Sequence, residues 1–286
     1  MGGAAPLTEA LAALVETLVR ELDCDDGSLW LHDGQGGPLA CVAEAPPGSA
    51  PRLPPTLPTA PATSAAGIVV PLMSGADAIG LLELAYRGPE LDDDLSGFAE
   101  ALGVQMGEFV VRKRAEELLL HQALHDSLTG LPNRVLFIDR LDHAIRRLQR
   151  EQAPLAVLFL DFDGFKAVND RFGHAGGDEV LKRAADRVSA ALRAEDTVAR
   201  FGGDELVVLS EHVAGPAGGA LIAERILEQL RSPIDIEGEQ VVLTASIGIC
   251  VAPVEGATRD ELLHTADGAM YRAKATGPGR YVIAGD

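Results

Sequence analysis

The stretch Arg200–Leu206 (RFGGDEL) constrains the fold of this chain more than any other. Short apolar runs flank Gly202 and Gly203, and adjacent glycines between such runs predict a β-hairpin because glycine reaches positive φ without strain. Asp204 and Glu205 follow directly, at positions where strands are otherwise apolar. Neighbouring carboxylates repel each other unless a cation or a proton lies between them. The stretch therefore predicts either a solvated acidic turn or a site for a hard cation such as Mg²⁺, which prefers oxygen ligands.

A second carboxylate stands at the end of another predicted strand. Residues 155–160 (LAVLFL) are apolar without alternation, which is typical of a central strand buried on both faces. The run ends at Asp161, and a glycine-containing turn with Lys166 follows. Backbone N–H groups of such a turn and the lysine charge suit the phosphates of a nucleotide. This strand end is therefore a candidate partner for the acidic hairpin.

The order of predicted elements brings the two acidic segments together. The elements are a strand at 155–160, a helix at 174–192, a hairpin at 197–210, a helix at 217–230, a strand at 241–251, a helix at 259–275 and a short strand at 280–284. The first five follow the split βαβ, ferredoxin-like order, in which the first strand lies beside the second strand of the hairpin. Asp161 and Asp204 are therefore expected to converge at one sheet edge. This is the palm arrangement of nucleotide polymerases and cyclases, with Mg²⁺ held against a triphosphate, and it favours a metal site over a solvated turn.

The N-terminal part, residues 1–110, is expected to form a second α+β domain, since 286 residues suffice for about two domains. Helical spacing of leucines predicts a helix over 7–22. Strand-like runs follow at 28–31, 39–42, 68–72 and 78–84, and turn glycines separate several of them. Residues 46–63 contain seven prolines and are predicted to form a surface loop or a disordered excursion, because proline cannot pair in a central strand.

A long helix over about 93–125 is expected next, and residues 111–126 of it connect to the second domain, residues 127–286. Its apolar residues keep an approximately heptad spacing. Two interpretations remain: a helix that closes the first domain, or a parallel coiled coil between two subunits. Asn133 is a candidate N-cap for the following helix, residues 135–149.

Composition excludes several classes of partner. The formal net charge of −19 argues against binding nucleic acid or an anionic membrane through a basic face. The three cysteines have no metal-ligand spacing and are expected to be small core residues in a reducing compartment. The N-terminal residues lack the pattern of a signal peptide, and no apolar run approaches the length that spans a bilayer. A cytoplasmic protein is expected.

Residues 69–84 (VVPLMSGADAIGLLEL) resemble the strand–turn–strand of GAF domains, and the resemblance extends over the N-terminal domain. It implies an antiparallel-sheet sensor that binds a small molecule, such as a cyclic nucleotide or a tetrapyrrole, or that only dimerises. Cys24 and Cys41 are then either structural residues or chromophore anchors. The sequence does not choose a ligand for this domain.

Three motifs in the second domain resemble the GGDEF family, the diguanylate cyclases. They are DSLTGLPNR (126–134), FLDFDGFKAVNDRFGHAGGDEVL (159–181) and RFGGDEL (200–206), and the resemblance covers residues 122–284. Members of this family are homodimers that make cyclic di-GMP from two GTP and release pyrophosphate. Their cofactor is Mg²⁺, or Mn²⁺ in its place. The resemblance implies that Asp161, Asp204 and the carbonyl of Phe162 bind the metal. It implies that Glu205 assists metal binding or removes the proton of the attacking 3′-hydroxyl.

The same resemblance implies the GTP contacts. Asn169 and Asp178 are implied to recognise guanine, because a carboxylate can accept hydrogen bonds from its N1–H and N2–H₂ groups. The alternative for Asp178 is an acid in the first turn of a helix, where it is favourable against the helix dipole. Lys166 and Lys274 are implied to contact phosphates, and Lys166 is also implied to be a catalytic residue. The alternative for both is an ordinary solvated surface lysine.

Two positions depart from the family. Leu206 replaces phenylalanine and is expected only to repack the core. Pro278 stands where family members usually carry a phosphate-binding arginine, with Arg280 two residues later as a candidate substitute, so weakened GTP binding is expected.

Arg193 and Asp196 match the RxxD site at which relatives bind cyclic di-GMP and are inhibited by it, and arginine suits guanine and phosphate alike. The alternative is an ion pair at a helix end. For the whole chain, the alternative to an active cyclase is a degenerate domain that binds GTP or cyclic di-GMP as a receptor.

Overall fold

The computed structural model describes residues 7–32, 38–48, 58, 60–64, 67–85, 93–151, 153–252 and 258–285. They form two compact units, divided in the sequence between Leu120 and His121. The boundary falls within one helix, α2 (Asp93–Leu124). Within these ranges every helix is too short or too polar to span a lipid bilayer.

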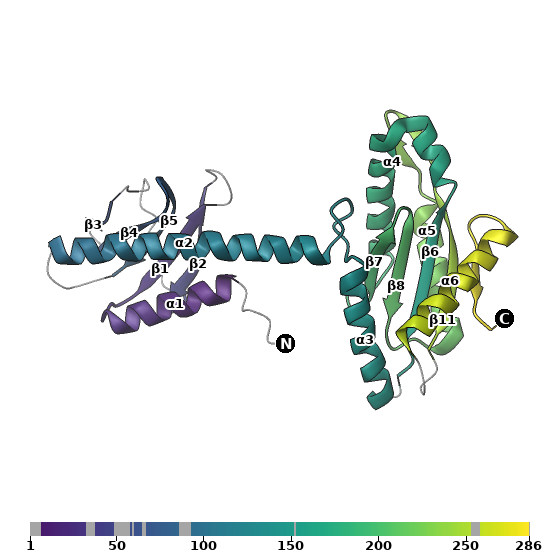
Figure 1. The fold of residues 1–286 in the computed structure, drawn as a ribbon, viewed down its shortest axis with the longest axis horizontal. Coiled ribbons are helices and arrows are strands. Elements are labelled where there is room, and N and C mark those ends of the chain that lie inside the picture. Colours follow the sequence, from purple (N-terminus) through teal and green to yellow (C-terminus); the bar gives the residue numbers. More distant parts are fainter. Residues whose placement is uncertain are drawn as a thin grey trace. The chain divides into compact units, whose positions relative to one another are not determined.

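The N-terminal unit is built on a five-stranded antiparallel sheet with the order β2-β1-β5-β4-β3 (Figure 1). Its elements are α1 (Leu7–Glu21), β1 (Gly27–His32), β2 (Leu39–Ala45), β3 (Ala62–Ser64), β4 (Gly67–Ser74), β5 (Asp77–Leu84) and α2. These confirm the predicted helix, the four predicted strands and the closing helix. Most of the proline-rich stretch, residues 49–57 and 59, lies outside the described residues, and its last residues enter the edge strand β3.

The first part of α2 packs closely on this sheet. A Cβ at Gly107 would lie 2.0 Å from the carbonyl oxygen of Met73, so only glycine allows this approach of α2 to β4. Further along, α2 exposes large apolar residues, with Leu118 57% and Leu119 64% exposed. The helix thus closes its own domain and also exposes an apolar segment, and the coiled coil between two subunits stays a prediction.

The cysteines follow the prediction only in part. Cys250 is buried, whereas Cys24 and Cys41 are partly exposed at the edge of the N-terminal core. Burial raises the pKa of the Cys24 thiol, and the neighbouring acid Asp23 adds to the rise. None of the three is in a disulfide.

The C-terminal unit contains a five-stranded sheet with the order β12-β11-β6-β8-β7. Its elements are α3 (Arg134–Glu151), β6 (Ala156–Asp163), α4 (Phe165–Ala190), β7 (Thr197–Gly202), β8 (Glu205–Ser210), α5 (Gly215–Leu230), β9 (Ile234–Ile236), β10 (Glu239–Val241), β11 (Thr244–Val251), α6 (Arg259–Thr276) and β12 (Tyr281–Ile283). β6 lies between β11 and β8 and is antiparallel to both, which confirms the predicted ferredoxin-like order. β12 extends the sheet parallel to β11.

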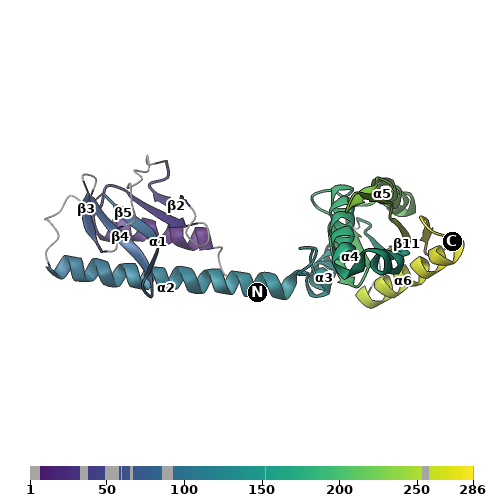
Figure 2. The same cartoon turned by 90° about the horizontal axis from the view of Figure 1, so that it is seen from above.

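Helices cover both faces of this sheet (Figures 1 and 2). α4 and α5 share one core with Leu158 and Leu160 of β6, while α3 and α6 share the other with Val157 and Phe159. Because side chains alternate along a strand, Asp161 belongs to the face of Phe159, the face covered by α6. Leu206 is fully buried, as expected for an inward strand residue.

The structure differs from the sequence prediction in three local features. α4 begins at Phe165 rather than 174, because Gly173 breaks it with a left-handed φ of 69° and hides its first two turns from a pattern of helical spacing. The small hairpin β9–β10 was not predicted, and β11 begins at Thr244 rather than 241. The predicted cap is confirmed: the Asn133 side-chain oxygen accepts from the N–H groups of Val135 and Leu136.

Candidate active site

The two acidic segments converge where β6 and β8 run side by side. Asp161 pairs with Glu205 in the strand register. The N–H of Phe162 donates to the carbonyl of Asp204 at 3.3 Å, which ties the backbone of β6 to the hairpin turn. The structure therefore brings Asp161, Phe162, Asp204 and Glu205 together, as the ferredoxin-like order requires.

Asp161 is the most buried acid of this group, 8% exposed. Its Oδ1 lies 2.7 Å from Nζ of Lys274, which α6 places over the same sheet face. Burial raises the pKa of Asp161 above its ordinary value; the Lys274 hydrogen bond opposes the rise, and the charge of Asp204 adds to it. The carboxylate thus lies in a setting that favours a nearby positive charge.

The pKa of Glu205 is raised by the same concentration of negative charge. Burial raises its pKa, and the charges of Asp161, Asp267 and Asp204 raise it further. The sequence prediction missed Asp267. It lies seven residues before Lys274 on α6, two helical turns away and so on the same face, which is the signal that could have found it.

These residues fit a magnesium ion that is bound together with a nucleotide. Within the described part of the chain, no group of three or more His, Cys, Asp or Glu side chains is arranged to hold a metal by itself. Mg²⁺ is commonly held by one or two carboxylates and completes its coordination with substrate phosphates and water. Asp161 and Asp204, among mutually repelling acids, match that kind of site.

Arg200 holds the hairpin turn in place through hydrogen bonds to its backbone. Gly202 and Gly203 have φ values of 157° and 52°, and the Arg200 guanidinium donates to the Gly203 carbonyl at 2.7 and 3.0 Å. The same guanidinium donates to Oδ1 of Asp126 at 2.9 Å. Burial alone would raise the pKa of Asp126, but hydrogen bonds from Thr129 and Arg200 outweigh it and hold the pKa below its ordinary value. Neither residue was predicted as functional, although both lie within the recognised motifs.

The predicted guanine contacts, Asn169 and Asp178, lie on either side of the break in α4. Asn169 lies before Gly173 and Asp178 after it. A Cβ on Gly177 would lie 1.8 Å from Oδ1 of Asn169, so the Asn169 amide occupies the space that a side chain at 177 would need. Asp178 is exposed beside it. The Asn169 amide therefore lies against Gly177, the residue that precedes Asp178.

For the guanine-binding role that the resemblance implies for Asn169, we expect Gly177→Ala to raise the KM for GTP by about tenfold, because the new methyl group displaces Asn169 and costs roughly one hydrogen bond to the base. The kcat should change less. Gly218→Ala is the matched control, since a Cβ at that helical glycine meets its nearest atoms at an ordinary 3.4 Å. Steady-state kinetics on both variants check this, and an unchanged KM in Gly177→Ala would contradict it.

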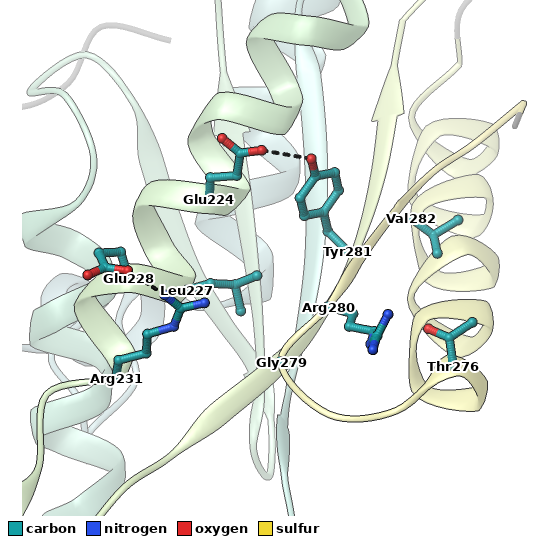
Figure 3. Close-up of a pocket in the computed structure, with 9 residues that line it drawn as sticks. All are labelled: Glu224, Leu227, Glu228, Arg231, Thr276, Gly279, Arg280, Tyr281 and Val282. Carbon is teal, nitrogen blue, oxygen red and sulfur yellow. Dashed lines mark hydrogen bonds and ion pairs between the residues drawn. The ribbon is translucent and has the colours of Figure 1, made fainter.

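The remaining predicted phosphate contacts lie in different settings. Lys166 is exposed in the first turn of α4. Arg280 lines a pocket of about 570 Å³ beside α5 and β12, together with Glu224, Arg231 and Tyr281 (Figure 3). None of the other predicted site residues lines that pocket. Lys274 is therefore the predicted phosphate contact that the structure places directly at Asp161.

The RxxD residues form a turn between α4 and β7. The backbone N–H of Arg193 donates to Oδ2 of Asp196 at 2.9 Å, and the N–H of Asp196 donates to the Arg193 carbonyl at 3.1 Å. Oδ1 of Asp196 is buried and has no hydrogen-bond partner among the described residues. The Arg193 side chain is exposed and makes no ion pair within the described part of the chain.

The chain is similar to known proteins over its C-terminal unit. Residues 123–280 match the family described as "Diguanylate cyclase, GGDEF domain". MucR of Pseudomonas aeruginosa, a bifunctional diguanylate cyclase/cyclic di-GMP phosphodiesterase, is 49% identical over 168 residues, 59% of this chain and 24% of MucR. The diguanylate cyclase TpbB of the same species is 47% identical over 197 residues, 68% of this chain and 43% of TpbB. The chain thus spans less than half the length of either relative.

Solved structures show the same likeness. The GGDEF domain of TpbB superposes with a TM-score of 0.54 at 45% identity, covering 56% of this chain and 94% of that domain. The coiled coil and GGDEF domain of DgcB from Caulobacter crescentus, in complex with c-di-GMP, superposes with a TM-score of 0.60 at 25% identity, covering 66% of this chain and all of that one (100%).

Proposed function

Because this chain belongs to the GGDEF family of diguanylate cyclases, we propose that it condenses two GTP molecules into cyclic di-GMP and releases pyrophosphate. The observation that carries the proposal is the convergence of Asp161 at the end of β6 with Asp204 in the β7–β8 turn, with Lys274 paired to Asp161 at 2.7 Å. A partly buried pair of carboxylates beside a lysine suits a metal-bound triphosphate.

Each residue then has a role that its surroundings support. Asp161, Asp204 and the Phe162 carbonyl would hold Mg²⁺, or Mn²⁺ in its place, which when bound neutralises phosphate charge and activates the attacking 3′-oxygen. Lys274 and Lys166 add positive charge toward the phosphates. Glu205, whose pKa is raised by burial and by its acidic neighbours, is suited to take the proton of the 3′-hydroxyl or to assist the metal.

Asn169 and Asp178 would orient guanine through its donor groups, since the amide and the carboxylate both offer acceptors. Arg280 lines the pocket of Figure 3, which none of the other predicted site residues lines, and it would be a further contact to phosphate. Orientation of the two nucleotides relative to each other supplies the rest of the rate enhancement.

Two GTP molecules must face each other, so the active form is proposed to be a homodimer. The exposed leucines 118–120 of α2 would associate in a coiled coil between subunits. The N-terminal antiparallel sheet is proposed to be a GAF-like sensor that sets the spacing of the catalytic units, with residues 1–110, 111–126 and 127–286 as sensor, connecting helix and cyclase. The identity of its small-molecule ligand is left open.

The direct test is to incubate the purified protein with GTP and Mg²⁺ and to separate the products by chromatography. Cyclic di-GMP and pyrophosphate are expected from the unaltered protein, and none above background from Asp204→Ala. The second candidate, a receptor that binds GTP or cyclic di-GMP without turnover, is favoured by Pro278 in place of the usual arginine. GTP binding without product, in both proteins, would support the receptor and contradict the cyclase.

Product inhibition through Arg193 and Asp196 is a further part of the proposal. We expect Arg193→Ala to raise the cyclic di-GMP concentration for half-inhibition by roughly 10- to 100-fold, the equivalent of lost charged hydrogen bonds. Folding should be unaffected, because the turn uses the backbone N–H of residue 193. Initial rates with added cyclic di-GMP measure the shift. If inhibition and Tm are both unchanged in this variant, the proposal that cyclic di-GMP inhibits by binding at Arg193 and Asp196 is wrong.

A further inference from the structure

We propose that Asp163 is a positioning residue that fastens the loop at residues 277–280 to the catalytic strand, and that it is not a metal ligand. The inference rests on the proposed function of the site. Asp161 and Asp163 lie two residues apart on β6 and share one sheet face, so either could in principle bind the ion. Their surroundings assign them different tasks.

The Asp163 carboxylate is already engaged by three donors. Oδ2 accepts from Oγ1 of Thr244 at 2.8 Å and from the backbone N–H of Gly279 at 2.8 Å, and Oδ1 accepts from Oγ of Ser246 at 2.6 Å. A carboxylate offers about four acceptor positions, so little capacity is left for a cation. Asp161, in contrast, has Lys274 and the charge of Asp204 beside it.

The sequence of β11 explains this division. Thr244 pairs with Asp163 and Ser246 with Asp161 in the β6–β11 register, so both hydroxyls lie on the face of the two acids. Ser246 is fully buried. A buried hydroxyl needs a hydrogen-bond partner, and Asp163 supplies it. The hydroxyls thereby occupy acceptor positions of the Asp163 carboxylate and leave Asp161 for a positive charge.

The third donor connects Asp163 to the end of α6. Gly277 caps that helix, three residues after Lys274, and Gly279 has a left-handed φ of 67°. Pro278 has no N–H, so the Gly279 N–H is the donor by which this loop reaches β6. The carbonyl of Arg280, the next residue, accepts a hydrogen bond from the N–H of Ile247 in the sheet at 2.9 Å. The loop is therefore held on both sides.

The loop in turn fixes the position of Lys274 relative to Asp161. Family members usually place a phosphate-binding arginine at the position of Pro278, and proline has no charge to offer. What this loop contributes in this chain is position: it holds the last turn of α6, and with it the ammonium group, against the catalytic strand. Asp163 acts on the reaction through that loop and does not touch the reacting atoms.

Two substitutions at one position separate positioning from metal binding. Asp163→Ala removes the acceptors of all three hydrogen bonds and should raise the KM for Mg–GTP by roughly tenfold or more, with a smaller change in kcat. Asp163→Asn keeps an oxygen that can accept from Gly279, and the hydroxyl of Ser246 can turn to accept from the new amide. It should stay within about threefold of the unaltered protein. Asp186→Ala, an exposed acid of α4, is the control.

Two readouts do not depend on turnover. Mn²⁺ binding, followed by electron paramagnetic resonance with a non-hydrolysable GTP analogue, should persist in Asp163→Asn and be lost in Asp161→Asn. Hydrogen exchange of the peptide that contains residues 277–283 should accelerate in Asp163→Ala, and partly in Thr244→Ala if the first variant does not fold.

Loss of Mn²⁺ binding in Asp163→Asn to the level of Asp161→Asn would make Asp163 a ligand and overturn the proposal. Unaltered exchange of the 277–283 peptide in Asp163→Ala would overturn it as well. If the unaltered protein bound Mn²⁺ and nucleotide but made no cyclic di-GMP, the proposed function would fail. The two readouts would still decide the role of Asp163.

Discussion

Asp161→Asn is expected to lower the rate of cyclic di-GMP formation by about 10³-fold, because a metal-holding charge at the reacting phosphate is removed. The substitution keeps the size of the side chain and removes a negative charge from among Asp204, Glu205 and Asp267. It leaves Lys274 unpaired, but that side chain is 38% exposed and can be solvated. The change in the free energy of unfolding should therefore stay within about 1 kcal/mol.

This combination of a large kinetic effect and a small effect on stability is the signature of a site residue. Initial rates measured by chromatography and urea denaturation of the same preparations test both halves. Asp186→Asn, at an exposed position of α4, should change neither. A rate within tenfold of the unaltered protein in Asp161→Asn would rule out this residue as a metal ligand.

Arg200→Ala is expected to lower the free energy of unfolding by about 2–4 kcal/mol. Arg200 is only 15% and Asp126 only 23% exposed, so removing one partner leaves a half-buried charge without its counter-ion. The variant also frees the Gly203 carbonyl, whose residue precedes Asp204. We therefore expect catalysis to fall along with stability, since the turn that carries Asp204 is no longer held.

A double-mutant cycle with Asp126→Ala measures the coupling. The double variant should be little less stable than either single variant, because the lost interaction is the same one. The exposed pair Arg231 and Glu228, at 70% and 69% exposure, is the matched control and should cost less than about 1 kcal/mol. Additive losses at Asp126 and Arg200 would mean that they do not act together, and would contradict the proposed lock.

The sequence was informative wherever a pattern is local. Apolar runs, glycines and helical spacing predicted most elements of both units, and the order of elements predicted that β6 would lie beside β8. The start of α4 was wrong by more than two turns, because the left-handed Gly173 interrupts a helix that continues on both sides. Sequence analysis recognised the residues that form a motif. It did not recognise the roles that depend on which side chains become neighbours in the folded protein.

Asp163 illustrates that limit. Sequence analysis assigned Asp161 to the metal and gave Asp163 no role, because the three donors that define its role come from β11 and from a residue 116 positions later. Asp126 and Arg200, 74 positions apart, are a second case. Pro278 is a third, since its replacement of an arginine was visible in the sequence, whereas the anchoring of its loop through the Gly279 N–H was not.

By itself, then, the amino-acid sequence determined most of the strands and helices, the placement of β6 beside β8 and the acids at the ends of these strands. Hydrophobic periodicity and glycine conformations act over a few residues at a time, and they can be recognised without coordinates. Only the tertiary structure decided which carboxylate lies beside Lys274, which one accepts hydrogen bonds from two hydroxyl groups and which one forms an ion pair with Arg200. The charge and hydrogen bonding of a side chain depend on the neighbours that packing brings to it, and those neighbours come from distant parts of the chain.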